Sequence, residues 1–303
     1  MKKIKPKTYK PKNYTLGEAF ESYAFAAPLI ILIALFLLLP VIGSFVASFF
    51  QHAAPDGKEF ILLKNYEIMV RDAQFLRSLR FTLFFILVSV PLEVFIGLIF
   101  ALLMNLKIPY KGILLACVLI PWMIPSVVSA RIWQHIYNYS FGAANYLFIK
   151  LGVTTEPINW LGSSLGAFFA VVAADACKSA PFAAIIIFAG LRVIPDELYK
   201  QARIDRAGSF FTFSKITLPL IMPVIVIVFI FRTIDALRIF DILYVLTSGG
   251  PAGATTSLSL YSYRHFSGGD FGYASCISVV IFVIAFALSI AYIRFADFKR
   301  EII

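Results

Sequence analysis

The chain has 303 residues, of which 60% are hydrophobic and 15% are charged, and its mean hydropathy is +0.85. Soluble domains are about 45–50% apolar and about 25% charged, so this composition excludes an ordinary soluble domain. The formal net charge is +10, but the basic residues lie in the tails and between apolar blocks. That placement argues against nucleic-acid binding and is typical of the charge bias that orients membrane proteins.

Six apolar blocks follow one another along the chain. About 20 helical residues cross the roughly 30 Å of hydrocarbon in a bilayer, and each block supplies about that many. Because lipid offers no partners to backbone polar groups, these blocks are expected to be helices. We therefore predict an all-α integral membrane protein with about six transmembrane helices. The predicted spans are residues 23–50, 81–106, 112–133, 165–191, 218–239 and 273–295.

The distribution of Lys and Arg predicts how these spans are oriented. Basic residues concentrate in the cytoplasmic tails and loops of membrane proteins. Residues 1–21 are rich in lysine, and we predict a cytoplasmic basic tail that can also contact anionic membrane lipid. The remaining residues, 22–303, are expected to form one transmembrane domain with both termini inside.

The loop over residues 192–217, between the fourth and fifth spans, is long, polar and predicted to be helical. Pro195 stands where helices often open, with Asp196 and Glu197 in the first turn. Gly208 is expected to close this helix and Ser209 to cap a second, shorter one. A structured cytoplasmic helix at this place is a candidate docking element for a soluble partner.

This loop carries a motif. The segment LYKQARIDRAGSFFTFSKITLP, from Leu198 to Pro219, resembles the cytoplasmic EAA loop of permease subunits in binding-protein-dependent ABC importers. The Glu-Ala-Ala, Asp-Gly-Ala and final Pro positions of that family pattern fall on Lys200, Gln201 and Ala202, on Asp205, Arg206 and Ala207, and on Pro219.

The resemblance extends along nearly the whole chain. Gly190-Leu191 before Ile194-Pro195 resembles the Gly-Leu-x-x-Ile-Pro entry of this family. The segment from Phe240 to Pro251 resembles the one after the fifth span in its carbohydrate-uptake group, and the chain resembles the maltose/trehalose-type first permease of that group. The resemblance implies a multi-pass protein of a bacterial or archaeal inner membrane that translocates a sugar. It also implies a second homologous permease, two ATP-binding subunits and an extracytoplasmic solute-binding protein as partners.

The resemblance further implies that residues 192–217 hold a coupling helix, with Lys200, Gln201, Ala202, Asp205, Arg206, Ala207, Gly208 and Pro219 as the residues that couple to the ATPase. The chain has no Gly-x-x-x-x-Gly-Lys-Ser/Thr phosphate loop, so ATP and Mg are expected on the partner subunits. We expect no cofactor, no metal and no enzyme activity on this chain.

Two positions depart from the family pattern. Lys200 stands where the family usually has Glu, which implies a changed or lost ion pair with the ATPase. An exposed ion pair contributes about 0–1 kcal/mol, so coupling could survive that loss. Arg206 stands where the family usually has Gly, and Gly208 is expected to supply the bend instead.

Charged residues lie within the predicted spans. Placing a charge at the centre of a bilayer costs at least about 2.5–3.5 kcal/mol, so these side chains are expected to face protein or water. Asp175 and Lys178 are three residues apart on one helix and are expected to pair. Arg232, Asp235 and Arg238 share the same spacing in the fifth span.

The resemblance implies that the stretches around these charges line the sugar site. The residues carried over are Asp175, Lys178, Ser179, Phe182, Arg232, Asp235, Ala236 and Ile239. Sugar hydroxyls bond to ionised groups and sugar rings stack on aromatic faces. An internal ion-pair network that only joins helices is the competing interpretation of the charges. For Glu93, pairing with a neighbouring helix is favoured over substrate binding.

Two other functions remain as alternatives. The intramembrane Lys and Arg could hold an anion, which would suit an importer of glycerol phosphate or an anionic saccharide. A proton-coupled secondary carrier working through Asp175 or Asp235 is a different class. A membrane-embedded enzyme is least favoured, because no nucleophile–base pair or metal-binding cluster appears in the sequence.

Overall fold

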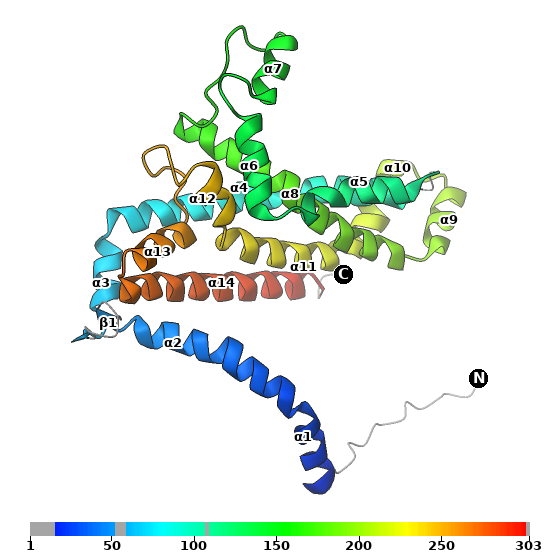
Figure 1. Cartoon of the computed structure of the whole chain (residues 1–303). Coiled ribbons are helices and arrows are strands. Elements are labelled where there is room, and N and C mark those ends of the chain that lie inside the picture. The colour runs from blue at the N-terminus through cyan, green and yellow to red at the C-terminus, as the bar shows by residue number, and fades with distance from the viewer. Residues whose placement is uncertain (1–15, 52–58, 107–108, 301–303) are drawn as a thin grey trace.

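The computed structural model describes residues 16–51, 59–106 and 109–300, and almost all of them are helical (Figure 1). Strands β1 (Phe50–Gln51) and β2 (Glu59–Phe60) form one short antiparallel pair. The long helices are α1 (Leu16–Ile33), α4 (Ala73–Asn105), α8 (Ser164–Val193), α11 (Leu218–Leu237) and α14 (Phe271–Arg300). A π-helical turn, Ala34–Leu38, joins α1 to α2 (Leu39–Ala47).

Five helices of the described residues are long and apolar enough to cross a membrane, and a bent helix pair makes a sixth if it counts as one span. These six segments fall, in chain order, on the six apolar blocks of the sequence. The predicted boundary between tail and transmembrane domain lies at residue 21. Residues 1–15 are outside the described part of the chain, and α1 already begins at Leu16.

The third predicted span, 112–133, is not a single helix. It divides into α5 (Lys111–Met123) and α6 (Ser126–Ile136), whose axes differ by 95°. Pro125 has no amide proton and disfavours helical backbone at the residue before it. Ile124 is accordingly extended, so the chain turns sharply where a straight helix was expected.

The second span begins before the predicted boundary at residue 81. Asp72 has extended backbone and its side chain accepts a hydrogen bond from the amide of Gln74 at 2.8 Å, which caps α4. An Asp at this position satisfies an amide that has no partner within the helix. The short helix α3 (Lys64–Arg71) ends directly before it.

The centre of the bundle is formed by α4 packed along α8, with α11 across both. Small residues allow the close contact of α4 and α8: a Cβ built on Gly97 would lie 2.6 Å from the Cβ of Ala183. Small residues at helix contacts are typical of membrane proteins. Phe85, Ile187 and Ile221, one from each helix, are fully buried in the main apolar core.

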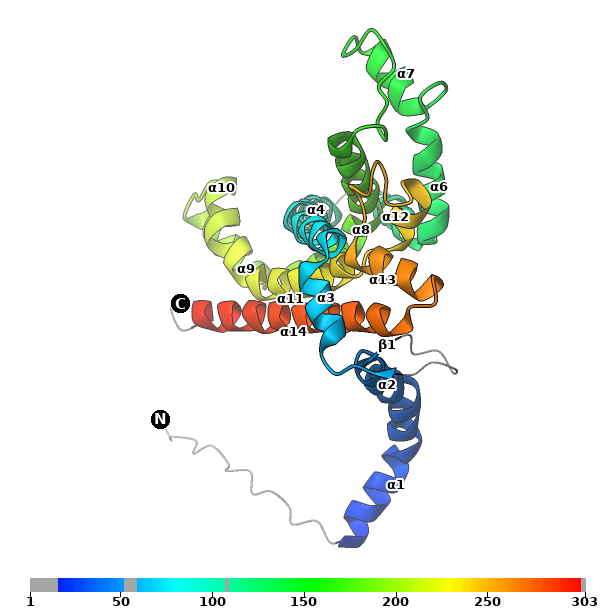
Figure 2. The ribbon, with the colours of Figure 1, turned by 90° about the vertical axis from the view of Figure 1, so that its left-hand side faces the viewer.

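Helices α1 and α2 stand apart from this bundle, as both views show (Figure 2). Only α2 packs against the rest of the described chain, along α14, where the rings of Phe45 and Phe282 lie 5.9 Å apart. None of the most apolar window of Ala24–Ala47 is buried. Apart from its contact with α14, this segment therefore offers its apolar surface to lipid or to another membrane protein.

The two ends of the bundle carry different elements. Helices α9 (Asp196–Ile204) and α10 (Ser209–Thr212) lie at the same end of the bundle as the C-terminal end of α14 (Figure 1). Helices α3 and α13 (Leu258–Ser267) and the strand pair lie at the opposite end. The polar loop between the fourth and fifth spans and the C-terminal end of α14 thus share one end of the bundle.

Candidate functional site

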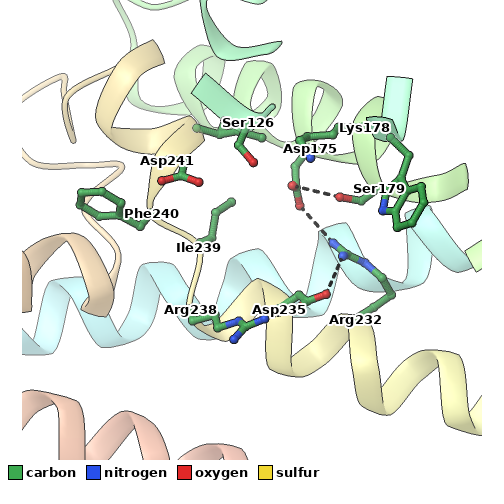
Figure 3. A pocket seen from close by; sticks show the side chains of 12 residues that line it. Ser126, Asp175, Lys178, Ser179, Arg232, Asp235, Arg238, Ile239, Phe240 and Asp241 are labelled. Atoms are coloured by element: carbon green, nitrogen blue, oxygen red, sulfur yellow. Dashed lines mark hydrogen bonds and ion pairs between the residues drawn. The ribbon is translucent and has the colours of Figure 1, made fainter. Parts of the chain in front are cut away.

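A pocket of about 400 Å³ lies among the break between α5 and α6, the middle of α8 and the C-terminal end of α11 (Figure 3). Six of the eight residues predicted for the sugar site line it: Asp175, Lys178, Ser179, Arg232, Asp235 and Ile239. The residues Trp122, Ser126, Arg238, Phe240, Asp241 and Ile242 complete the lining.

The guanidinium of Arg232 is the centre of an ion-pair network in this pocket. Its Nε lies 2.6 Å from Oε2 of Glu93. Its two terminal nitrogens lie 3.6 Å from Oδ2 of Asp175 and 3.2 Å from Oδ2 of Asp235. Because Glu93 is on α4 and Asp175 on α8, this one side chain links three helices. Arg232 is only 6% exposed and Glu93 is fully buried.

Two serines complete the hydrogen bonds of the buried carboxylates. Ser89 donates to Oε1 of Glu93 at 2.6 Å and lies 3.5 Å from Asp175. Ser179 donates to Oδ1 of Asp175 at 3.3 Å. Charges buried at this depth are tolerated when each is paired and hydrogen-bonded, as these are.

The expected pair of Asp175 with Lys178 does not form. Asp175 pairs instead with Arg232 from α11, and Lys178 makes no ion pair within the described part of the chain. The guanidinium offers several donors in a planar fork and reaches the carboxylate from the facing helix. The expectation that Glu93 pairs with a neighbouring helix is confirmed.

Two residues carried over from the family do not line the pocket. Ala236 is 1% exposed and belongs to the apolar core. Phe182 is outside the lining, with its ring 6.0 Å from that of Trp122 and 6.3 Å from that of Phe231. Phe182 therefore supports Trp122 and does not itself form an aromatic surface of the pocket.

Sequence reasoning missed Trp122 and Ser126 as pocket residues. They flank the break between α5 and α6, which turns both of them towards α8 and α11. Pro125 was the available signal, since a proline within an apolar block marks a kink or break. Arg238 follows Asp235 by three residues, a spacing that allows an ion pair, and its Nη2 lies 2.8 Å from Oδ1 of Asp235.

The charges that line the pocket balance. Asp175, Asp235 and Asp241 oppose Lys178, Arg232 and Arg238. Glu93 lies directly behind and adds one further negative group. Such a lining offers many hydrogen-bond donors and acceptors but no excess of positive charge, which suits a polar, uncharged solute.

The polar loop at the end of the bundle begins with α9, in which Ala202 is buried and most other side chains are exposed. Ala202 is 6% exposed, whereas Ile204 is 80% and Phe210, on α10, is 83% exposed. Lys200 is exposed and lies 4.0 Å from Glu197, one turn earlier. Exposed apolar side chains beside charged ones are typical of a surface that binds another protein.

The end of α9 differs from the expectation. Arg206 has a φ of +53° and adopts the left-handed backbone that usually falls to Gly, whereas Gly208 has a φ of −66°. The prediction that Gly208 supplies the bend is therefore wrong. Gly208 itself precedes α10 as its N-cap residue, so Ser209 does not cap that helix.

A notch of about 530 Å³ lies between α9 and the segment that leads into α11. Five of the predicted coupling residues line it: Gln201, Ala202, Asp205, Ala207 and Gly208. The hydroxyls of Tyr199 and Thr217 lie 3.2 Å apart and join α9 to the π-helical turn before α11. Pro219 is in the first turn of α11.

A membrane-spanning bundle with a polar pocket between its helices, and an exposed helical loop at one end, defines a transport subunit that works with a soluble partner. The sequence identifies the family. The chain belongs to the binding-protein-dependent transport system inner membrane components, and the family model matches residues 93–298.

Three known proteins show the similarity. The chain is 44% identical to the trehalose/maltose transport system permease protein MalF of Thermococcus litoralis, over 94% of this chain and 96% of that protein. A crystal structure of a bacterial ABC transporter involved in the import of the acidic polysaccharide alginate has a TM-score of 0.79 at 23% identity, covering 93% and 96% of the two chains. The same kind of transporter in complex with its alginate pentasaccharide-bound periplasmic protein has a TM-score of 0.75 at 23% identity and covers 91% and 93%.

Proposed function

We propose that this chain is the permease subunit of an ABC importer that carries an uncharged saccharide across the membrane, driven by ATP hydrolysis on separate subunits. The observation that carries the proposal is the pocket around Arg232, which is polar, hydrogen-bonded and enclosed by the spans on either side of the coupling loop. A relative that is 44% identical over most of both chains is a trehalose/maltose permease protein, which supports a sugar as the solute.

The charge balance of the pocket favours one of the saccharide classes. The guanidinium of Arg232 already contacts Glu93, Asp175 and Asp235. Lys178 is the one lining cation that makes no ion pair among the described residues, but the three carboxylates of the lining and Glu93 behind them oppose a further negative charge. The hydroxyls of an uncharged sugar can donate to the carboxylates and accept from the cations at the pocket wall. We therefore favour an uncharged sugar over glycerol phosphate or an acidic saccharide.

The coupling loop would transmit motion of the ATPase to the pocket. Helix α8, which carries Asp175, ends at Val193 directly before α9. On the other side, Ser209–Leu237 is continuous helix from the loop to Arg232. A displacement of α9 therefore acts on both helices that hold the pocket. Its exposed Ile204 and the nearby Phe210 would bind the ATPase surface, with Lys200 and Glu197 beside them.

The partners follow from the surfaces. Two ATP-binding subunits would bind the α9–α10 end, one of them on this chain, and a solute-binding protein would bind the opposite end. The transporter of the same fold that was solved with its periplasmic protein supports that partner. A second, homologous permease would complete the pore and cover apolar surface that this chain leaves exposed.

The experiment is reconstitution of the purified importer in proteoliposomes with its binding protein and radiolabelled trehalose. We expect Asp175→Ala and Asp235→Ala to lower ATP-dependent uptake at least about tenfold while the protein still reaches the membrane. Glu67→Ala, which removes an exposed carboxylate of α3, should retain uptake. Wild-type uptake in both Asp variants would refute the pocket assignment, and uptake without ATP or partner subunits would favour the secondary carrier.

Coupling is tested separately. Ile204→Asp and Phe210→Asp place a charge on the apolar surface of the loop and should reduce copurification of the ATPase subunit and ATP-dependent uptake together. Val193→Asp, in the exposed last turn of α8, is the comparison. An unchanged ATPase association in both loop variants would refute this docking surface.

A further inference from the structure

Glu93 lies outside the lining of the pocket, yet it makes the shortest ion pair in the network around Arg232. Its carboxylate has no exposed surface, and its two oxygens are both engaged: Oε2 by the Nε of Arg232 and Oε1 by the hydroxyl of Ser89, each at 2.6 Å. No solute in the pocket can reach these oxygens. Whatever Glu93 contributes to transport must therefore act through Arg232.

The geometry shows what that contribution is. The Nε of an arginine fixes the plane of the guanidinium, so a bond from Nε to Glu93 determines where the two terminal nitrogens point. In this protein they point to Asp175 and Asp235, both of which line the pocket (Figure 3). Without Glu93, the long side chain of Arg232 would be free to turn towards any of the remaining carboxylates.

Glu93 also sets the net charge around the pocket. The lining alone has three carboxylates and three cations. Glu93 pairs with Arg232 from behind the lining and offsets the charge of that guanidinium, so the pocket offers less positive charge to an anionic solute. In a region of low dielectric constant one buried charge at this range changes the affinity for an ion by on the order of tenfold.

We propose that Glu93 is a positioning residue that aims the guanidinium of Arg232 at Asp175 and Asp235 and, by offsetting its charge, makes the pocket selective for uncharged saccharides. The proposal rests on the pocket being the saccharide site. It predicts that changing Glu93 alters which saccharides bind as well as how tightly they bind.

Trp122 provides a reporter, because it lines the pocket. The purified, complete importer without its binding protein would be titrated with trehalose and with a glucuronosyl glucose, a disaccharide of similar size with one carboxylate. The fluorescence change that is absent in Trp122→Phe is the signal from the pocket. Thermal unfolding of each variant is recorded in parallel.

Three variants separate the contributions of charge, position and packing. Glu93→Gln keeps the shape and removes the charge, and we expect binding of the anionic disaccharide to strengthen by about tenfold relative to trehalose. Glu93→Asp keeps the charge but withdraws the carboxylate from Arg232, and we expect weaker trehalose binding with the preference against the anion retained. Thr82→Val is the matched control: it is fully buried on the same helix and its hydroxyl bonds the amide of Leu258, so it should lower the unfolding temperature and leave the preference unchanged.

The outcomes are distinct. If no saccharide changes the Trp122 signal in the unmodified protein, the pocket assignment fails and the role of Glu93 fails with it. If trehalose binds but Glu93→Gln keeps the wild-type preference, the proposed function stands and the role of Glu93 in selectivity is refuted. If Glu93→Gln does not fold, Glu93→Asp decides: trehalose affinity equal to wild type refutes the positioning role.

Discussion

The amide of Ala207 donates to the carbonyl of Ala202 at 2.8 Å and closes the C-terminus of α9 around Arg206. Together with the bond from the amide of Arg206 to the carbonyl of Arg203, this is the double hydrogen bond of a helix that ends through a left-handed residue. Gly is the usual residue there, because any other side chain costs about 1–2 kcal/mol in that conformation.

This relationship predicts that Arg206→Gly stabilises the C-terminal end of α9. The gain should be about 0.5–1 kcal/mol, since the greater freedom of Gly in the unfolded chain offsets part of the relief. Hydrogen exchange of the amides of residues 203–208 would then slow. Arg203→Gly, inside α9, is the control and should accelerate exchange; faster exchange in both variants would contradict the prediction.

The network around Arg232 predicts a large difference between two arginines of the same helix end. Arg232→Met leaves Glu93, Asp175 and Asp235 without their buried cation and should cost about 3–5 kcal/mol. Arg238→Met removes a pair that is largely exposed and should cost at most about 1 kcal/mol. The yield of monodisperse protein and its unfolding temperature measure both.

A double variant tests whether this loss comes from the uncompensated charge. Combining Arg232→Met with Glu93→Met removes both members of the tightest pair, and a buried pair replaced by apolar residues often regains stability. We expect the unfolding temperature to recover in part relative to Arg232→Met. A double variant less stable than either single variant would show that packing, and not charge, dominates at this site.

The contact of α4 with α8 predicts that replacing Gly97 with a larger residue destabilises the fold. A Cβ at this position would lie 2.6 Å from Ala183 and 3.0 Å from the carbonyl of Ala180, so Gly97→Ala should cost about 1–3 kcal/mol. Gly43→Ala on α2 is the matched control, because nothing lies within 4 Å of its Cβ. Equal unfolding temperatures for the two variants would mean that α4 can move away from α8 without loss.

Asp72 predicts how stability depends on pH at the end of the bundle opposite α9. Burial raises the pKa of this carboxyl, but hydrogen bonds from Tyr261, from Tyr273 at 2.7 Å and from backbone amides outweigh it and bring the pKa below its ordinary value. The stability that Asp72 contributes is therefore fully present above its unfolded pKa and is lost as the pH falls through its folded pKa. Burial, and then the carboxylate of Asp72, raises the pKa of Tyr261. The stability that Tyr261 contributes is therefore fully present below about pH 10 and is lost as the pH rises through its folded pKa.

The free energy of unfolding contributed by Asp72, Tyr261 and Tyr273 should therefore not change with pH between about pH 5 and pH 9. Asp72→Asn should lower it across that range by about 1–3 kcal/mol, because the tyrosine hydroxyls lose a charged acceptor. Thermal unfolding at a series of pH values, with Glu67→Gln as an exposed control, measures this. A variant as stable as wild type at pH 7 would contradict the assignment.

Several features were predictable because they depend on neighbouring residues in sequence. The apolar blocks predicted the spans, since about 20 apolar helical residues fit the thickness of a bilayer. The polar pattern after Pro195 predicted α9. The intramembrane positions of Asp175, Arg232 and Asp235 predicted that these residues would meet protein, since lipid would not tolerate their charge.

Other features depend on contacts between distant parts of the chain. Spacing along α8 favoured a pair of Asp175 with Lys178, but a guanidinium from α11 lies at Asp175 instead. Residues 112–133 were predicted as one span, and the 95° turn that brings Trp122 into the pocket depends on what α5 and α6 pack against. The ion pair of Glu93 with Arg232 joins residues 139 positions apart, and spacing along a helix carries no information on it.

The sequence by itself determined that this is a membrane transport subunit with a helical polar loop between its fourth and fifth spans, because hydropathy, charge bias and the loop motif depend on contiguous residues. Only the tertiary structure decided which charges meet, which residues line the pocket, and that Arg206 takes the left-handed turn. The physical reason is that a buried charge is stabilised by whichever partners the packed helices place within hydrogen-bonding distance, and helix packing depends on all of the chain at once.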